Sequence, residues 1–322
     1  MKLLIISMCK NEAAMIGKLI DRIPRKYPHV HTVDIHIIDD GSTDDTAQVA
    51  REHGAQVTSD GAGKGLAFRF REALELALDN DYDLLVNIDG DLQFNPEDIP
   101  SLVAPITAGE ADFVAADRFT DPETGRVRRP ENMPLSKYIG NKMGAYVVSK
   151  LSRRIFQDVT CGFRAYNRKA ILALNLNSTH TYTQESFQVM ALKRLRIISL
   201  PTHVTYYKQR KSRVVTSLPR YILTSGLNII RAYRDFAPLK FFFGLGSVPM
   251  VLGLACAAFV GQHWLRTGFF SPYKFIGIIG LYLISLGIFV WGLGIVADML
   301  VRLTNTQERT LELMKRSRRK DR

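Results

Sequence analysis

Two long apolar runs near the C-terminus constrain this chain more than any other feature of its sequence. Phe241 to Gly261 is a run of about 21 residues without a charged side chain, and Phe275 to Ala297 is a second of about 23. A helix needs about 20 apolar residues to cross the hydrocarbon core of a bilayer. A buried helix of a soluble core is the alternative for one such run, but two in succession favour membrane crossing. We therefore predict two transmembrane helices.

Both runs are rich in glycine, which permits close helix–helix contact in lipid. These glycines are Gly244, Gly246, Gly253, Gly277, Gly280, Gly287, Gly292 and Gly294. The connection, roughly Gln262 to Lys274, is short, so the two helices are expected to form an antiparallel hairpin. Such a hairpin is compatible with a homo-oligomer, although the sequence does not count subunits.

Basic residues flank the hairpin on one side. Four precede it and eight follow it, while the connection carries only Arg266 and Lys274. The flanking residues are Arg220, Arg231, Arg234 and Lys240, then Arg302, Arg309, Lys315, Arg316, Arg318, Arg319, Lys320 and Arg322. The positive-inside rule then places both termini, and the large N-terminal part, in the cytoplasm. The stretch Leu3 to Met8 is too short for the apolar core of a signal peptide.

The formal charge of +12 raises the question of nucleic acid. Much of the excess follows the second apolar run, and no zinc-finger spacing or other nucleic-acid module is present, so an anionic membrane surface is the better interpretation and nucleic acid is not expected as a partner. The three cysteines are too few and too scattered for a disulfide framework or a metal site.

We expect four segments: a cytoplasmic domain over residues 1–214, a juxtamembrane helix over 215–238, the two crossings within 239–300 and a basic tail over 301–322. In the juxtamembrane segment, apolar side chains recur at helical spacing with arginines between them, which suits a helix lying in the membrane interface. Those side chains are Leu218, Ile222, Ile229, Tyr233 and Phe236. A soluble amphipathic helix is the alternative.

The N-terminal part alternates apolar runs of strand length with helical patterns, which predicts an α/β domain with a mainly parallel sheet covered on both faces. The predicted strands are Leu3–Met8, Ile35–Ile38, Gln56–Thr58, Leu84–Ile88 and Phe113–Ala115. The predicted helices are Glu12–Tyr27, Asp44–His53, Leu66–Asp79 and Glu97–Ala108.

Acidic residues follow the predicted strands, where ligands of such sheets bind. Asp39 ends the second strand, and Asp89 and Asp91 follow the fourth. Their mutual repulsion must be relieved by a cation, by hydrogen bonds or by raised pKa values. Asp44 has an easier explanation as a helix cap. An Asp-x-Asp pair offers hard oxygen ligands for Mg²⁺ or Mn²⁺, which also coordinate a diphosphate.

The segment Gly61-Ala62-Gly63-Lys64-Gly65 precedes a predicted helix but lacks the spacing of an ATPase phosphate loop. A flexible turn near a nucleotide, with Lys64 as a contact, fits it better.

Four motifs in order carry a resemblance: Cys9-Lys10-Asn11-Glu12, Ile38-Asp39-Asp40-Gly41-Ser42-Thr43-Asp44, Gly63-Lys64-Gly65, and Asp89-Gly90-Asp91-Leu92-Gln93. Together they resemble the inverting, metal-dependent glycosyltransferases of family 2, which have the GT-A fold. The segment Asp158-Val-Thr-Cys-Gly-Phe-Arg-Ala-Tyr-Asn-Arg168 is similar to one found in dolichyl-phosphate mannose synthases and bacterial polyprenyl-phosphate glycosyltransferases, although Cys161 replaces the usual serine.

The resemblance implies roles residue by residue. It places Asn11, Glu12, Asp39 and Asp40 around the base and ribose of a nucleotide sugar, with Arg118 near the donor phosphates. It makes Asp89, Asp91 and Gln93 the metal neighbourhood. It places Asp158 and Arg164 in the catalytic pocket and, more loosely, Glu185 as a third acidic residue there. Asp158 orienting an arginine and Glu185 on a helix surface are the alternatives.

A lipid phosphate is already an anionic nucleophile, so the chemistry needs cationic groups and alignment more than a strong base. Two basic clusters are candidates for binding it: Arg128, Arg129, Lys137 and Lys142, and then Arg210, Lys211 and Arg213. A solvated basic face is the alternative for each residue. The long loop from about Asp117 to Leu135 is either a functional lid or disordered.

The expected activity is transfer of a monosaccharide from a UDP- or GDP-sugar to polyprenyl phosphate. A transferase acting on another lipid such as diacylglycerol, and a non-catalytic membrane scaffold with a nucleotide-binding fold, are the alternatives. A processive polysaccharide synthase is disfavoured because the Gln-x-x-Arg-Trp signature is absent.

Overall fold

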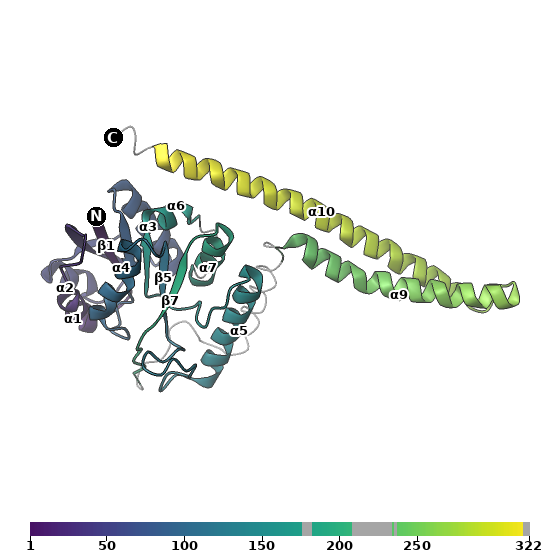
Figure 1. Cartoon of the computed structure of the whole chain (residues 1–322), viewed down its shortest axis with the longest axis horizontal. Coiled ribbons are helices and arrows are strands. Elements are labelled where there is room, and N and C mark those ends of the chain that lie inside the picture. The colour runs from purple at the N-terminus through teal and green to yellow at the C-terminus, as the bar shows by residue number, and fades with distance from the viewer. Residues whose placement is uncertain (176–181, 208–233, 235–236, 318–322) are drawn as a thin grey trace. The chain divides into compact units, whose positions relative to one another are not determined.

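The computed structural model describes residues 1–175, 182–207, 234 and 237–317 (Figure 1). The chain divides into two compact units, one built mainly from Met1–Ile222 and the other mainly from Leu223–Leu311. Most of the predicted juxtamembrane helix lies outside the described residues, as do Arg210, Lys211 and Arg213 of the second basic cluster.

The first unit is built on a seven-stranded sheet with the order β3-β2-β1-β4-β6-β5-β7. The strands are β1 (Lys2–Cys9), β2 (Thr32–Asp39), β3 (Gln56–Ser59), β4 (Leu84–Asn87), β5 (Phe113–Asp117), β6 (Arg164–Asn167) and β7 (Ile197–Pro201). Strand β6 is antiparallel to both its neighbours, and the other pairings are parallel. The mainly parallel sheet and all five predicted strands are confirmed, while β6 and β7 were not predicted.

Helices cover the sheet on both sides. They are α1 (Ala13–Arg22), α2 (Thr46–Glu52), α3 (Leu66–Asp79), α4 (Ile99–Thr107), α5 (Leu135–Ser152), α6 (Arg168–Ala173) and α7 (Thr183–Leu192), with a short 3-10 turn η1 (Pro96–Asp98) before α4. The third predicted helix, Leu66–Asp79, has the same bounds as α3. The prediction that the first extends to Tyr27 is wrong, because Ile23 is extended before Pro24, and a residue before proline disfavours helical geometry.

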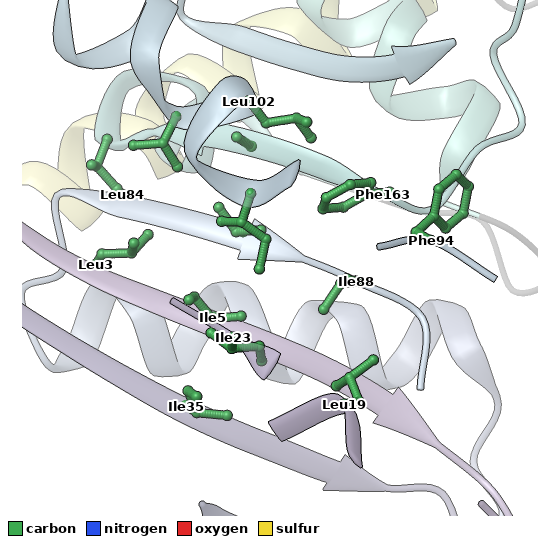
Figure 2. Packing of buried hydrophobic residues seen from close by; sticks show 14 of the residues in the cluster. Leu3, Ile5, Leu19, Ile23, Ile35, Leu84, Ile88, Phe94, Leu102 and Phe163 are labelled. Carbon is green, nitrogen blue, oxygen red and sulfur yellow. The ribbon is translucent and has the colours of Figure 1, made fainter. Parts of the chain in front are cut away.

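Alternation along the central strands builds two cores. Leu3 and Ile5 of β1 pack on one side of the sheet, and Leu4 and Ile6 pack on the other. The first core also receives Leu19 of α1 and Leu102 of α4 (Figure 2). The second receives mainly side chains of α3, α6 and α7. Burial on both faces fixes the register of the strands and hence the position of their ends.

The second unit contains α9 (Pro238–Thr267) and α10 (Lys274–Ser317), and both are long and apolar enough to cross a membrane. Their large apolar side chains are mostly exposed, unlike those of a soluble core helix. Helix α9 extends past the predicted crossing to Gly268, whose φ of 74° ends it in the left-handed region. Helix α10 continues through most of the predicted tail, as far as Ser317.

Glycines bring α9 and α10 into close contact. A Cβ on Gly253 would lie 2.6 Å from the carbonyl oxygen of Gly280, and one on Gly287 would lie 2.9 Å from that of Gly246. The Trp291 indole nitrogen donates to the Phe243 carbonyl oxygen at 3.1 Å. The predicted antiparallel hairpin is therefore present, although not every glycine serves it: Gly244 and Gly292 have nothing within 4 Å of a Cβ, and a Cβ on Gly277 would make only ordinary contact with Val260.

Candidate active site

The carboxyl ends of three adjacent strands bring the predicted acidic residues to one edge of the sheet. In the register, Cys9 of β1 lies opposite Asp39 of β2, and Ile6 lies opposite Asn87 at the end of β4. A Cβ on Gly90 would lie 2.5 Å from the Cys9 sulfur, so only glycine fits between Asp89 and Asp91 while the Cys9 side chain keeps its position. Cys9 therefore packs directly beneath the Asp89–Asp91 turn.

Asp89 and Asp91 repel each other at this edge. Burial first, and then the charge of Asp91, raises the pKa of Asp89 to about 6, although Arg118, Arg164 and Lys137 oppose the shift. Gly162 packs against the same carboxylate, since a Cβ there would lie 2.7 Å from Asp89 Oδ1. A divalent cation would relieve such repulsion, and the oxygen donors fit Mg²⁺ or Mn²⁺.

The turn after Asp91 holds an unfavourable backbone conformation. Leu92 has a φ of 56° although it is not glycine, and the Gln93 amide donates to Asp91 Oδ1 at 3.1 Å. The segment after β7 supports this turn: the Thr205 amide donates to the Gln93 carbonyl oxygen at 2.9 Å, and the Tyr207 hydroxyl donates to that of Leu92 at 3.3 Å. The turn that carries Asp91 is thus held by contacts within itself and from the segment after β7.

A buried ion pair joins Arg118 to Asp158. Arg118 Nε donates to Asp158 Oδ2 at 2.6 Å and Nη2 donates to Oδ1 at 2.9 Å, a bidentate arrangement. Arg118 also donates to the hydroxyls of Thr160 and Tyr206. Burial alone would lower the pKa of Arg118, but the Asp158 carboxylate outweighs burial and holds that pKa above its usual value. Asp158 therefore fixes the orientation of a permanently charged arginine beside the acidic pair.

Lys137 on α5 adds a second cation to the site. Its ammonium nitrogen lies 5.1 Å from the centre of the Tyr206 ring. Burial, followed by the positive charge of Arg118, lowers the pKa of Lys137, while Asp91, Asp89 and Asp158 oppose the shift. Lys137 is therefore within electrostatic reach of both the acidic pair and Arg118.

Arg164 lies beneath the site and not on its surface. The side chain is completely buried, and it donates through Nε to the Cys161 carbonyl oxygen at 2.6 Å and through Nη2 to that of Val159 at 3.1 Å. Its charge lies 5.0 Å from the Phe187 ring centre and close to two further aromatic rings. The expectation that Arg164 lines the pocket is corrected, because at the first position of β6 it faces the core.

Asn87 holds the same loop from the neighbouring strand. Its side-chain nitrogen donates to the Gly162 carbonyl oxygen and to the Tyr182 hydroxyl, each at 2.7 Å. Together Arg164 and Asn87 bind three carbonyls of the loop 158–163, which presents Asp158 to Arg118 and Gly162 to Asp89.

Side chains link the ends of β1 and β2, where the resemblance implies the nucleotide. Asn11, with a φ of 56°, accepts from the Thr43 amide at 2.7 Å. Asp39 accepts from the Ser42 amide at 3.0 Å and from the Ser59 hydroxyl at 2.6 Å. The Glu12 amide donates to Thr46 Oγ1 at 2.8 Å. The predicted residues Asn11, Glu12 and Asp39 therefore belong to one set of connected loops, which forms a wall of the site.

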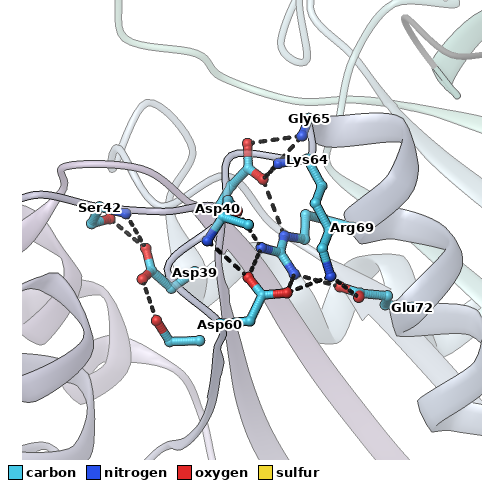
Figure 3. A network of polar contacts seen from close by, with 10 residues as sticks. Asp39, Asp40, Ser42, Asp60, Lys64, Gly65, Arg69 and Glu72 are labelled. Atoms are coloured by element: carbon cyan, nitrogen blue, oxygen red, sulfur yellow. Dashed lines mark hydrogen bonds and ion pairs between the residues drawn. The ribbon is translucent and has the colours of Figure 1, made fainter.

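Asp40 belongs to a larger network around Arg69 (Figure 3). Arg69 is fully buried and donates to Asp40 at 3.1 Å, to Asp60 at 2.5 Å and to Glu72 at 2.8 Å. Asp40 also accepts from the backbone amides of Lys64 and Gly65 at 2.7 and 3.0 Å. The glycine-rich turn is therefore fixed, and the Lys64 ammonium pairs with Asp60 within it.

The remaining predicted residues occupy separate positions. Glu185 lies in the first turn of α7, half-buried, and its catalytic role stays a prediction. Arg128 pairs with Asp121 at 2.6 Å, Arg129 is exposed, and Lys142 donates to Gln157 at 2.5 Å. The loop that carries Arg128 is ordered: Asp117 accepts from the Phe119 amide at 2.8 Å, and Thr120 bridges Val127.

Several residues of the site were not predicted. Arg69, Tyr206 and Asn87 contact predicted residues but belong to no motif that was singled out, and Thr160 lies within the segment Asp158–Arg168 but was given no role there. An arginine among the apolar positions of the helix that follows Gly65 was the signal available for Arg69. The others lack a comparable signal, because pairing across the sheet and the return of the chain after β7 bring them to the site.

The first unit is an α/β domain in which acidic residues at the strand ends lie near the cations Arg118 and Lys137. The sequence matches the profile described as Glycosyl transferase family 2 over residues 4–174. The chain therefore belongs to glycosyltransferase family 2, and its catalytic unit has the GT-A fold.

Three known proteins illustrate the similarity. Glycosyltransferase AglJ of Haloferax volcanii is 28% identical over 313 residues, which cover 96% of each chain. The UDP-N-acetylglucosamine–dolichyl-phosphate N-acetylglucosaminyltransferase of Methanococcus voltae is 24% identical over 247 residues, covering 70% of this chain and 90% of the relative. The crystal structure of Mycobacterium tuberculosis glucosyl-3-phosphoglycerate synthase with Mn²⁺, UDP and product has a TM-score of 0.53 at 19% identity, covering 71% and 79%, and shares the fold.

Proposed function

We propose that this enzyme transfers a monosaccharide from a UDP- or GDP-sugar to polyprenyl phosphate, with inversion at the anomeric carbon. The observation that carries the proposal is the pair of cations, Arg118 and Lys137, beside Asp89 and Asp91 in a chain with two membrane-length helices. The relative from Methanococcus voltae, whose name specifies a dolichyl-phosphate acceptor, supports the choice of acceptor.

The donor diphosphate and a divalent cation fit the acidic turn. Asp89 and Asp91 supply carboxylate oxygens, and Gln93 supplies an amide oxygen. Among the described residues, no group of three histidine, cysteine, aspartate or glutamate side chains is placed to hold a metal by itself. The oxygens of the donor would therefore complete the coordination. Bound there, Mg²⁺ or Mn²⁺ would neutralise the charge of the departing nucleoside diphosphate.

The acceptor phosphate requires cations and alignment. A phosphate monoester is already anionic at neutral pH, so the residues need only overcome its repulsion from the donor and direct its oxygen at the anomeric carbon. Arg118 is fixed in a single orientation by Asp158, and Lys137 approaches from α5. In this account Asp158 positions Arg118 and takes no proton: although burial would raise the pKa of Asp158, Arg118 holds that pKa below its usual value.

The nucleotide binds against the wall formed by Asn11, Glu12, Asp39 and Asp40. The turn that carries Lys64 closes one end of this nucleotide site. Because Arg69 and the Lys64 and Gly65 amides hold the Asp40 carboxylate, the wall is pre-organised before the donor binds. The basic residues that flank the hairpin support a cytoplasmic position for the catalytic unit and both termini, on the side where nucleotide sugars are available.

A direct test incubates the purified full-length enzyme with polyprenyl phosphate and a panel of UDP- and GDP-sugars, with Mn²⁺, with Mg²⁺ and with a chelator. We expect one donor to yield a lipid-phosphate-linked sugar only when metal is present. If no donor yields that product while diacylglycerol is glycosylated, the assignment of the acceptor fails. If no acceptor is glycosylated and no donor is consumed, the protein is a non-catalytic scaffold.

A further inference from the structure

Helix α5 has one buried face and one exposed face. Lys137, Asn141, Ala145 and Val148 lie on one face at helical spacing, and the last three are no more than 4% exposed. The Lys137 ammonium on this face lies 5.1 Å from the ring centre of Tyr206, whose hydroxyl accepts from Arg118 in the active site. The inner face therefore forms one wall of the site and packs onto the catalytic unit, at whose edge α5 is seen in Figure 1.

The opposite face is apolar and open. Leu135, Ile139, Met143 and Tyr146, spaced by four, four and three residues, share this face. Their exposed fractions are 58%, 54%, 48% and 63%, and Ile155 just beyond the helix is 87% exposed. A contiguous row of large exposed apolar side chains is rare on a soluble protein surface and marks a contact surface.

The charge around this face is of one sign. From Asn132 to Gln157 the chain contains no aspartate or glutamate. It contains five basic residues: Lys137 on the inner face, and Lys142, Lys150, Arg153 and Arg154. An apolar helix face bordered by lysine and arginine is the pattern that binds the interface of an anionic bilayer, where the apolar side chains enter the acyl boundary and the cations meet the headgroups.

We infer that the outer face of α5, formed by Leu135, Ile139, Met143 and Tyr146, lies in the headgroup region of an anionic membrane. A second copy of this chain is a poorer occupant, because a symmetric contact would bring two sets of basic residues together without acidic partners. Pairing with an acidic protein would not use the large aliphatic side chains.

The inference has a consequence for the reaction, which rests on the proposed function. A helix is about 10 Å across, so Lys137 would stand about one helix diameter above the apolar face, at the level of a lipid phosphate. The acceptor phosphate would then reach Lys137 and Arg118 without leaving the membrane surface, and only its headgroup would move.

The test uses the full-length protein in nanodiscs that contain anionic lipid and a lipid with a nitroxide headgroup. A fluorophore is attached at Met143→Cys in a Cys256→Ala background, since Cys9 and Cys161 are buried. The matched control is Glu52→Cys on α2. Glu52 is exposed, and α2 lies beside β3, the edge strand at one end of the sheet. We expect the nitroxide lipid to quench the Met143→Cys probe several-fold more than the control.

Equal quenching at the two positions would overturn the inference. So would protection of the Met143→Cys probe from both the nitroxide lipid and aqueous iodide, because another part of the chain or a second copy would then cover the face. This readout needs no sugar transfer, so it decides the inference even if the proposed function is wrong.

A kinetic test follows for an active enzyme. Ile139→Glu combined with Met143→Glu is expected to raise KM for polyprenyl phosphate by about tenfold or more, since it places carboxylates against acyl chains and anionic headgroups. The affinity for donor and metal should not change, and Ile139→Leu with Met143→Leu should behave as wild type. An unchanged KM in the glutamate variant would contradict the inference.

Discussion

Gly162→Ala perturbs the acidic turn through a single methyl group. The added Cβ would lie 2.7 Å from Asp89 Oδ1 and 3.0 Å from Oδ2, whereas ordinary contacts begin at 3.4 Å. The carboxylate or the loop must therefore move by about 0.7 Å, which is the difference between the two distances to Oδ1. Because Arg164 and Asn87 bind the loop carbonyls, the side chain of Asp89 is the part that yields.

The expected effect is large on activity and small on stability. Catalytic groups must be held within about 0.5 Å of the productive geometry, and a misplacement of 1 Å can cost about 100-fold in rate. We expect kcat to fall by about 10- to 100-fold and the Mn²⁺ concentration for half-maximal activity to rise. Replacement of glycine by alanine adds no polar group to the core, so the unfolding temperature should change little.

The assay is the initial rate of nucleoside diphosphate release with polyprenyl phosphate, measured over a series of Mn²⁺ concentrations, with thermal unfolding alongside. Gly17→Ala is the matched control: its Cβ would lie 2.6 Å from the His53 ring, but that ring is partly exposed and its partner Asp21 is exposed as well, so the pair can shift. A Gly162→Ala enzyme with wild-type kcat and unchanged Mn²⁺ dependence would refute the reasoning.

Three further changes test other parts of the account. Asp91→Asn should abolish turnover and leave the circular dichroism spectrum unchanged; activity near wild type would rule out the metal assignment. Arg164→Met should destabilise the protein by about 1–3 kcal/mol for each of the two carbonyls left without a donor. It should also lower kcat more than it raises the donor KM. Loss of stability at normal kcat would show that the residue has only a core role. Asp112 is 2% exposed and, although burial would raise its pKa, hydrogen bonds from Arg196 hold that pKa well below the usual value. Its stabilisation should be fully present above about pH 4 and be lost as the pH falls toward the folded-state pKa, so the difference in unfolding temperature between wild type and Asp112→Asn should shrink below pH 4; a gap that is constant from pH 7 to 3 would contradict this.

The sequence predicted the features that depend on local pattern. Apolar runs such as Leu3–Met8 and Leu84–Ile88 are strands because they are buried on both faces, and their ends place Asp39 and Asp89 at one edge. The glycine pattern in the two apolar runs predicted close contact, and Gly246, Gly253, Gly280 and Gly287 lie at it. The local order of residues along the chain was sufficient to predict these regions.

The features that were missed depend on direction and on distant pairing. Strand β6 is short and lies within a segment that was interpreted as a sequence motif. Its antiparallel pairing with β4 and β5 depends on the path of the chain through space, which the local sequence does not indicate. Resemblance gave the position of Arg164 but not the face of the sheet to which its side chain points. Helix α5 has little apolar asymmetry by sequence, because both faces carry apolar residues, and only burial distinguishes Val148 from Ile139.

The central claim is that the sugar is transferred to the phosphate of a membrane lipid, and ³¹P NMR of the reaction tests it most directly. With the preferred donor, Mn²⁺ and polyprenyl phosphate, the account predicts that the lipid phosphomonoester signal is replaced by a phosphodiester signal, with one nucleoside diphosphate released for each lipid converted. An unchanged monoester signal while nucleoside diphosphate accumulates would show that the sugar goes elsewhere and would contradict the account.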